Sequence, residues 1–270
     1  MLPGIESYRP QGAISVICCG STNGPAVNRT RVTTVALLCA ATAYAASTAV
    51  YAAIHLARSA DLARGSRPFE RQAVPGGPRL LVVGDSTAEG TGASAPRNSL
   101  PGLIARAHPA VTIVNRGRDG SKFRDVLQQL EVPGRFDAVL VLCGGNDVFR
   151  MTSMRTMRRT IDAVARKAAT VSGVVILMPA GNVGNAPFFL PPWTWLMQHR
   201  ARVLHRIVAD AARATGARYV DLFKERDHDP FALQPERMNA IDGLHPSDAG
   251  YALWHLELDR QAHLAQLLGN

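Results

Sequence analysis

Ser86, within the stretch VVGDSTAEG over residues 82–90, is the first candidate for covalent chemistry in this sequence. A serine hydroxyl becomes a nucleophile when a base removes its proton, an acid orients that base and donors stabilise an oxyanion. Near the C-terminus, the stretch DGLHPSDAGY contains Asp242 and, three residues later, His245. An imidazole titrates near neutral pH and is therefore a suitable base, and the carboxylate could fix its tautomer. These three side chains could together perform acyl transfer through a serine ester.

Donors for an oxyanion are expected from two further polar clusters. The run from Asn115 to Gly120 follows one apolar segment, and Gly144-Gly-Asn-Asp follows another. The donors we expect are the backbone N–H groups of Ser86 and Gly120 and the side-chain amide of Asn146. Glycine at position 120 would let the backbone approach a substrate closely. Each cluster taken alone is also typical of an ordinary turn, so the hypothesis depends on their meeting in space.

Short apolar runs rich in β-branched residues predict the elements that would bring these clusters together. Strands are expected at 80–83, 111–114, 138–142, 174–178 and 218–222, and helices near 98–107, 121–131, 153–171 and 195–215, with a last one after Pro246. This order indicates right-handed β-α-β units and a parallel five-stranded sheet covered by helices on both faces. Ligands bind at the carboxyl ends of such strands, where the polar clusters fall.

The clusters Gly84-Asp85-Ser86, Asn115 to Gly120, Gly144 to Asp147 and Asp242-x-x-His245 resemble the four sequence blocks of the SGNH, or GDSL-type, hydrolases. The likeness extends over roughly residues 79–265. It implies a flavodoxin-like three-layer α/β/α sandwich without a metal or organic cofactor. It also implies that Ser86 is the nucleophile, that Gly120 and Asn146 complete the oxyanion hole, and that Asp242 and His245 complete the triad. The sequence departs from the commonest first block, because a Gly-rich segment over 87–92 replaces the usual Leu or Ile and aromatic residue.

The segment AGNVGNAPFFLPPWTWLMQHR, residues 180–200, follows the fourth expected strand and should reach the same rim. As the wall of an acyl pocket or a lid, it offers candidate substrate contacts in Asn182, Asn185, Phe188, Phe189, Trp193 and Trp195. A packed loop that closes the core is an equal alternative.

For Asp227, His228 and Asp229 we expect a solvated loop and no metal site, because adjacent side chains point in different directions.

An uncharged stretch between Arg31 and Arg58, apart from His55, is longer than the roughly 20 residues that span a bilayer. We expect a flexible tail over 1–31, a transmembrane anchor or signal segment over 32–57, a linker over 58–78 and a hydrolase domain over 79–270. The AYA at 43–45 leaves a cleaved signal peptide open, although the apolar run continues past it. An anchored protein would hold its catalytic domain on the periplasmic or other extracytoplasmic side, and a cleaved one would be secreted.

Net charge and cysteine content show whether the sequence favours nucleic-acid binding, disulfides or a cysteine metal site. The formal net charge is +9, yet no interleaved basic and aromatic stripe supports nucleic-acid binding. The cysteines, at positions 18, 19, 39 and 143, form neither a disulfide framework nor a C-x-x-C metal site.

The expected function is that of a serine esterase that hydrolyses a carboxylic ester or thioester through an acyl-enzyme. Its substrate would be a small-molecule, lipid or glycan ester, and the N-terminal helix would make the membrane its other partner. Two alternatives stay open. One is an acyltransferase or carbohydrate O-deacetylase that acts on cell-envelope glycans or lipids, and the other is a non-catalytic binding module on the same fold.

Overall fold

The computed structural model describes residues 29–73 and 75–268, in two compact units that divide between Ala46 and Ser47. The described part of the first unit is the beginning of helix α1 (Arg29–Gly65). By length and composition, the stretch Thr30–Gly65 is apolar enough to cross a membrane, as a signal sequence also is. The segment expected over 32–57 is therefore helical throughout. The expected tail over 1–31 lies outside the described residues except for its last three.

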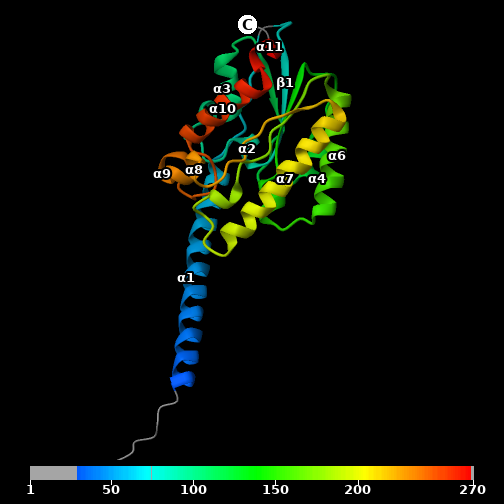
Figure 1. Ribbon diagram of the computed structural model, residues 1–270. Coiled ribbons are helices and arrows are strands. Elements are labelled where there is room, and N and C mark those ends of the chain that lie inside the picture. The colour runs from blue at the N-terminus through cyan, green and yellow to red at the C-terminus, as the bar shows by residue number, and fades with distance from the viewer. Residues whose placement is uncertain (1–28, 74, 269–270) are drawn as a thin grey trace, which may run out of the picture. The chain divides into compact units, whose positions relative to one another are not determined.

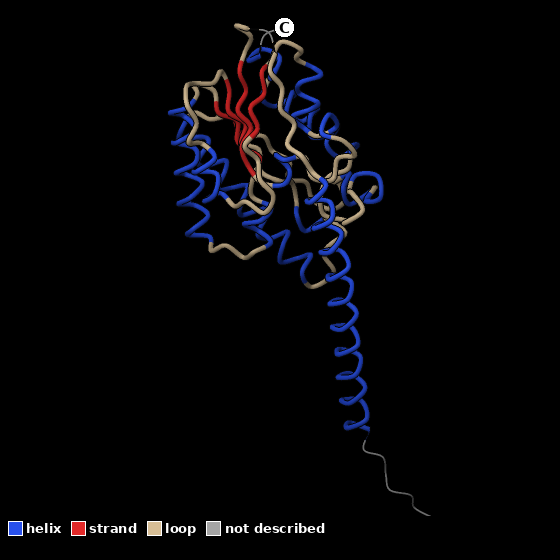
Figure 2. The backbone as a smooth tube through the Cα atoms, turned by 180° about the vertical axis from the view of Figure 1, so that it is seen from behind, coloured by secondary structure: helices blue, strands red, loops and turns tan. Residues whose placement is uncertain are grey.

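The second unit is built on a five-stranded parallel sheet in the order β2-β1-β3-β4-β5 (Figures 1 and 2). The strands are β1 (Arg79–Gly84), β2 (Thr112–Asn115), β3 (Ala138–Leu142), β4 (Val175–Leu177) and β5 (Arg218–Tyr219). In the register of the central strands, Leu81 lies beside Val114 on one side and Val139 on the other. Each strand overlaps its predicted apolar run, so the predicted parallel sheet is confirmed.

Helices cover both faces of this sheet, because alternate side chains of a buried strand point to opposite sides. Leu81 and Val83 pack with α4 (Phe123–Gln129), α6 (Met154–Val171) and α7 (Trp193–Thr215). Leu80 and Val82 pack with α3 (Leu100–Ala107), α10 (Asp248–Ala262) and α11 (Leu264–Leu268). Figure 1 shows these two helical layers with the strands between them. The predicted three-layer α/β/α fold is thus confirmed.

Short helical elements gather in the connections that follow the strands. They are α2 (Ser86–Glu89), η1 (Pro96–Asn98), α5 (Gly145–Phe149), η2 (Val183–Asn185), α8 (Pro230–Leu233) and α9 (Pro235–Met238). Helix α2 begins two residues after the end of β1, and helix α5 begins three residues after the end of β3. The carboxyl ends of the two central strands therefore present the first residues of α2 and α5 side by side.

Helix α1 continues to Gly65, whereas a linker was expected from residue 58. The intervening residues, RSADLAR over 58–64, hold Ala, Leu and Arg, which favour a helix, and no proline interrupts them. Beyond the helix, Arg71 pairs through its backbone with Ile113 of β2. Its guanidinium also donates to the backbone carbonyls of Ala105, His108 and Val111. The expected linker is therefore in part a helix and in part packed against the sheet edge.

Candidate active site

Ser86 lies in the tight turn from β1 into α2. At Gly84, φ is +148° and a Cβ would lie 1.8 Å from the backbone oxygen of Leu142, so a side chain is excluded there. Asp85 caps α2, because its Oδ1 accepts the N–H of Thr87 at 3.0 Å. Its Oδ2 accepts the N–H of Gly144 at 3.3 Å. One buried carboxylate thus joins the turn that carries Ser86 to the turn that follows β3.

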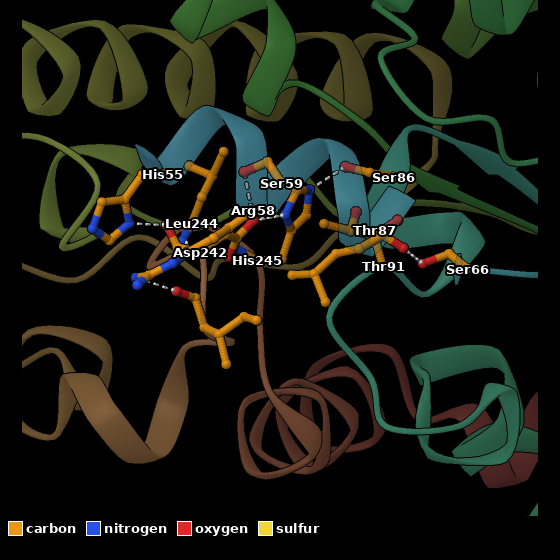
Figure 3. Close-up of polar contacts among 12 residues, drawn as sticks. His55, Arg58, Ser59, Ser66, Ser86, Thr87, Thr91, Asp242, Leu244 and His245 are labelled. Carbon is orange, nitrogen blue, oxygen red and sulfur yellow. Dashed lines mark hydrogen bonds and ion pairs between the residues drawn. The ribbon is translucent and has the colours of Figure 1, made fainter. Parts of the chain in front are cut away.

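A chain of hydrogen bonds links Ser86, His245 and Asp242 (Figure 3). The Oγ of Ser86 lies 2.8 Å from Nε2 of His245, and Nδ1 of His245 lies 2.6 Å from Oδ2 of Asp242. Asp242 is an acceptor when ionised, so the Nδ1 that faces it carries a proton. In the neutral ring, Nε2 then presents its lone pair to the serine hydroxyl. The arrangement places a base within reach of the proton it would remove.

The side chain of Asp242 is fully buried, and both of its carboxylate oxygens accept hydrogen bonds. Oδ1 accepts the backbone N–H groups of Leu244 at 3.0 Å and His245 at 3.1 Å. Oδ2 accepts the hydroxyl of Ser59 at 2.7 Å as well as the imidazole. Burial acts to raise the pKa of Asp242, but the hydrogen bond and charge of His245 and the hydrogen bond from Ser59 outweigh it and lower the pKa to about 2. Asp242 therefore stays ionised near neutral pH.

Gly120 and Asn146 line the same cavity as Ser86 and His245. Gly120 has a positive φ of +73°, which glycine adopts without strain. Asn146 lies in the first turn of α5. Across residues 29–73 and 75–268, neither the backbone N–H of Gly120 nor the side-chain amide of Asn146 donates a hydrogen bond to another protein group. Both are consequently available to an oxygen that develops negative charge in the cavity.

Two further contacts hold the loop that carries Gly120. The amide of Asn115 donates to the carbonyl of Ala88 at 2.8 Å, and its oxygen accepts the N–H of Gly117 at 2.9 Å. The Oε2 of Glu89 accepts the backbone N–H of Asp119 at 2.7 Å. Nothing in the sequence pattern indicated the role of Glu89, because an acidic residue in the first turn of a helix is commonly solvated. The bonds to Ala88 and Glu89 are the two that fasten the Gly120 loop to α2, whereas the bond between Gly117 and Asn115 lies within the loop.

A cavity of about 270 Å³ opens beside Ser86. Its lining includes the site residues described above, and most of the remaining lining is apolar. The apolar lining includes Leu56, Ala60, Phe149, Val183, Ala186, Leu222, Phe231, Leu244, Leu253 and Trp254. Leu56 and Ala60 belong to α1, whereas the sequence predicted a transmembrane anchor or signal segment at Leu56 and a linker at Ala60.

Of the six residues expected to contact substrate, Asn182 alone lines this cavity. Its amide, like that of Asn185, donates to the carbonyl of Lys224. Phe188 and Phe189 are buried in the core, where the two rings pack edge to face 4.9 Å apart. Trp193 and Trp195 are 54% and 67% exposed at the start of α7. The loop before α7 thus has both of the expected roles, since Phe188 and Phe189 close the core while Asn182, Val183 and Ala186 line the cavity.

The loop after β5 also differs from a uniformly solvated one. Asp227 and His228 are exposed and contact each other at 2.8 Å. Asp229 is buried, caps α8 through the N–H of Phe231 and accepts the amide of Asn185 at 2.7 Å. Within the described part of the chain, no group of three or more His, Cys, Asp or Glu side chains is placed to hold a metal ion.

Comparison with known proteins agrees with this geometry. The family model described as the GDSL-like lipase/acylhydrolase family matches residues 82–253. A GDSL-like esterase of Mycobacterium tuberculosis is 28% identical over 205 residues, which cover 70% of this chain and 64% of that relative. The chain therefore spans less than two thirds of that relative's length.

Solved structures show that the fold is shared. The lipase/acylhydrolase from Enterococcus faecalis is 24% identical, with a TM-score of 0.54 over 68% of this chain and 94% of that one. The extracellular lipase of Streptomyces rimosus is 16% identical, with a TM-score of 0.51 over 68% of this chain and 99% of that one.

Proposed function

We propose, from the premise that this chain belongs to the GDSL-like lipase/acylhydrolase family and is an ester-hydrolysing serine hydrolase, that Ser86, His245 and Asp242 are its catalytic triad. The observation that carries the proposal is the hydrogen-bonded chain from Ser86 Oγ to His245 at 2.8 Å and on to Asp242 at 2.6 Å. Gly120 and Asn146, whose N–H groups have no protein partner among the residues that the structure describes, line the same cavity.

Acylation follows from these positions. The Oγ of Ser86 attacks the ester carbonyl while Nε2 of His245 takes its proton. The carbonyl oxygen becomes an oxyanion that accepts hydrogen bonds from the N–H groups of Ser86 and Gly120 and the amide of Asn146. When the tetrahedral intermediate collapses, the bond to the leaving alcohol breaks and His245 returns the proton to it. Ionised Asp242 stabilises the imidazolium throughout.

Deacylation repeats these steps with water. His245 removes a proton from the water, the resulting hydroxide attacks the acyl-enzyme carbonyl, and the same donors bind the oxyanion. Collapse releases the carboxylic acid and returns the proton to Ser86. The largely apolar cavity of about 270 Å³ lies near the lower end of the roughly 300–1,000 Å³ of typical ligand sites, so we infer that short acyl chains fit best.

Covalent labelling tests the nucleophile. The full chain, kept in detergent, is treated with a fluorophosphonate and its intact mass is measured. We expect one adduct on the wild type and none on Ser86→Ala, because the probe requires an activated serine. Ser153→Ala is the matched control, since Ser153 caps α6 and does not line the cavity. An adduct on folded Ser86→Ala would rule out Ser86 as the nucleophile, and no adduct on the folded wild type would favour a binding module.

An acyltransferase would use the same residues and differ only in its acceptor. The discriminating measurement is product analysis with a p-nitrophenyl ester in the presence of added alcohols or glycans. Free acid as the main product supports hydrolysis, and a new ester supports transfer. Esters of graded acyl length, together with an O-acetylated glycan, would then define the substrate.

For localisation, we propose that α1 anchors the catalytic domain to the extracytoplasmic side of the membrane. The support is a helix long and apolar enough to span a bilayer. Alkaline extraction of membranes should leave the full-length chain in the membrane fraction, and protease added to intact cells with a permeable outer envelope should degrade the domain. A soluble secreted chain that begins after residue 45 would instead identify a cleaved signal peptide.

A further inference from the structure

One face of helix α1 is built into the active site, outside the residues 82–253 that the family model matches. Within the second unit, partly buried residues recur on α1 every three or four positions. This spacing defines a single helical face. The face consists of Thr48, Tyr51, Ala52, His55, Ser59, Leu62 and Ala63.

Three side chains of α1 fasten this part of the helix to backbone carbonyls of two loops. The hydroxyl of Tyr51 donates to Pro187 at 2.8 Å. Nδ1 of His55 lies 2.7 Å from the carbonyl of Asp242, which can only accept, so Nδ1 carries the proton there. The guanidinium of Arg58 donates to Ile241 at 3.3 Å. Two of these bonds reach residues 241 and 242, so the helix is fixed directly against the segment that carries the triad carboxylate.

The loop backbone leaves room for this contact at Gly243. A Cβ at that position would lie 3.4 Å from Nδ1 of His55 and 3.3 Å from the N of Phe188. The φ of Gly243 is also +65°, which disfavours any residue with a side chain. The ring of His55 packs against Tyr51 with centroids 4.2 Å apart and against Phe188 at 6.2 Å. Polar and aromatic contacts therefore combine to hold α1 at the loop.

Ser59 then contacts the catalytic carboxylate itself. Its Oγ donates to Oδ2 of Asp242 at 2.7 Å, and this is the same oxygen that accepts Nδ1 of His245 at 2.6 Å (Figure 3). A serine or threonine within a helix usually donates to the carbonyl four residues earlier. Thr34, Thr42 and Ser66 do so at 2.8 to 2.9 Å along and just after α1. Ser59 departs from this pattern in favour of Asp242.

We propose that Ser59 is a positioning residue for the Asp242 carboxylate, and that α1 is a structural part of the active site. The proposal rests on the function proposed for Ser86, His245 and Asp242. The backbone N–H groups of Leu244 and His245 fix Oδ1, and the hydroxyl of Ser59 fixes the plane in which Oδ2 meets the imidazole. Ser59 lies beyond the AYA at 43–45, so an anchored and a cleaved chain both retain it.

The test compares Ser59→Ala and Ser59→Thr in the full chain. We expect Ser59→Ala to lower kcat for a p-nitrophenyl ester roughly ten-fold with KM unchanged, because a hydrogen bond to a charged group is lost where it orients the base. Ser59→Thr keeps a hydroxyl and should restore most of kcat. The matched control is Ser66→Ala, because the hydroxyl of Ser66 donates to the carbonyl of Leu62 and to no other group in the described part of the chain. It should leave kcat at the wild-type value.

The outcomes separate this proposal from the proposed function. Unchanged kcat in folded Ser59→Ala, beside an inactive Ser86→Ala, would overturn the role of Ser59 and leave the triad standing. An active Ser86→Ala would instead overturn the triad. Equal losses of kcat in Ser59→Ala and Ser66→Ala, or a loss that Ser59→Thr does not restore, would show that Ser59 acts only on the helix. If Ser59→Ala does not fold, Ser59→Cys, with its weak thiol donor, replaces it with the same expected and contrary results.

Discussion

The guanidinium of Arg200 on α7 donates to the backbone carbonyl of Val148 at 3.0 Å, two residues after Asn146, which carries the candidate oxyanion amide. Arg200 also donates to the carbonyls of Asp147 and Thr152, so it satisfies the end of α5. On the other side of the site, Asp85 joins the Ser86 turn to Gly144. The turn that carries the nucleophile and the helix that carries Asn146 are thus each held by a buried polar side chain, Asp85 on one side and Arg200 on the other.

Replacement of Arg200 by methionine should destabilise the protein, because three carbonyls at the end of α5 lose their donors in a buried place. We expect a loss of about 3 kcal/mol in the free energy of unfolding, with a fall in kcat as α5 becomes mobile. Urea unfolding of the full chain measures the first effect. Arg202→Met is the control, because its exposed pair with Glu225 should contribute under about 1 kcal/mol. Equal stability of the two variants would refute the role of Arg200.

Asn146→Ala should separate chemistry from stability. The side-chain amide has no protein partner among the described residues, so its removal leaves the fold intact. Loss of an oxyanion donor should lower kcat by about 10²–10³, or roughly 3 kcal/mol of transition-state stabilisation. Steady-state kinetics with a p-nitrophenyl ester and a thermal melt measure the two properties. An unchanged kcat would remove Asn146 from the oxyanion hole.

The three central strands were predictable because they are buried on both faces and so appear as short apolar runs rich in β-branched residues, as in AVLVL over 138–142. The proximity of Ser86 and His245 could also be predicted, since each follows or precedes a recognisable turn or helix cap at the same rim of the sheet. The contact of Ser59 with Asp242 was not, because no motif or turn around Ser59 indicates that this part of the apolar helix packs against the catalytic domain. An apolar helix such as α1 has the same sequence pattern whether lipid or protein covers it. The burial of Phe188 and the exposure of Trp195 likewise depend on the conformation of the irregular loop before α7, which the sequence pattern does not specify.

The stability of the fold should depend on pH through Asp242. Its pKa in the folded state is about 2, below the ordinary value of 3.8, so the ionised group stabilises the fold above about pH 4. This contribution is lost as the pH falls through 2. We expect the free energy of unfolding to decrease between pH 4 and pH 2 by about 2 kcal/mol more in the wild type than in Asp242→Asn. Asp227→Asn, at an exposed carboxylate, should keep the wild-type slope. Parallel slopes for wild type and Asp242→Asn would contradict the lowered pKa.

Ala60 offers a test of α1 as the wall of the acyl cavity. Both Ala60 and Ala57 are exposed on the same helix, but only Ala60 lines the cavity beside Ser86. Ala60→Phe should fill part of a space of about 270 Å³, so kcat/KM for longer acyl esters should fall while that for acetyl esters changes little. Each acyl carbon excluded from the cavity removes about 0.8 kcal/mol of binding, or close to four-fold in kcat/KM. Ala57→Phe should keep the wild-type preference. If both variants retain that preference across p-nitrophenyl esters of two to eight carbons, acyl chains do not occupy the space beneath α1.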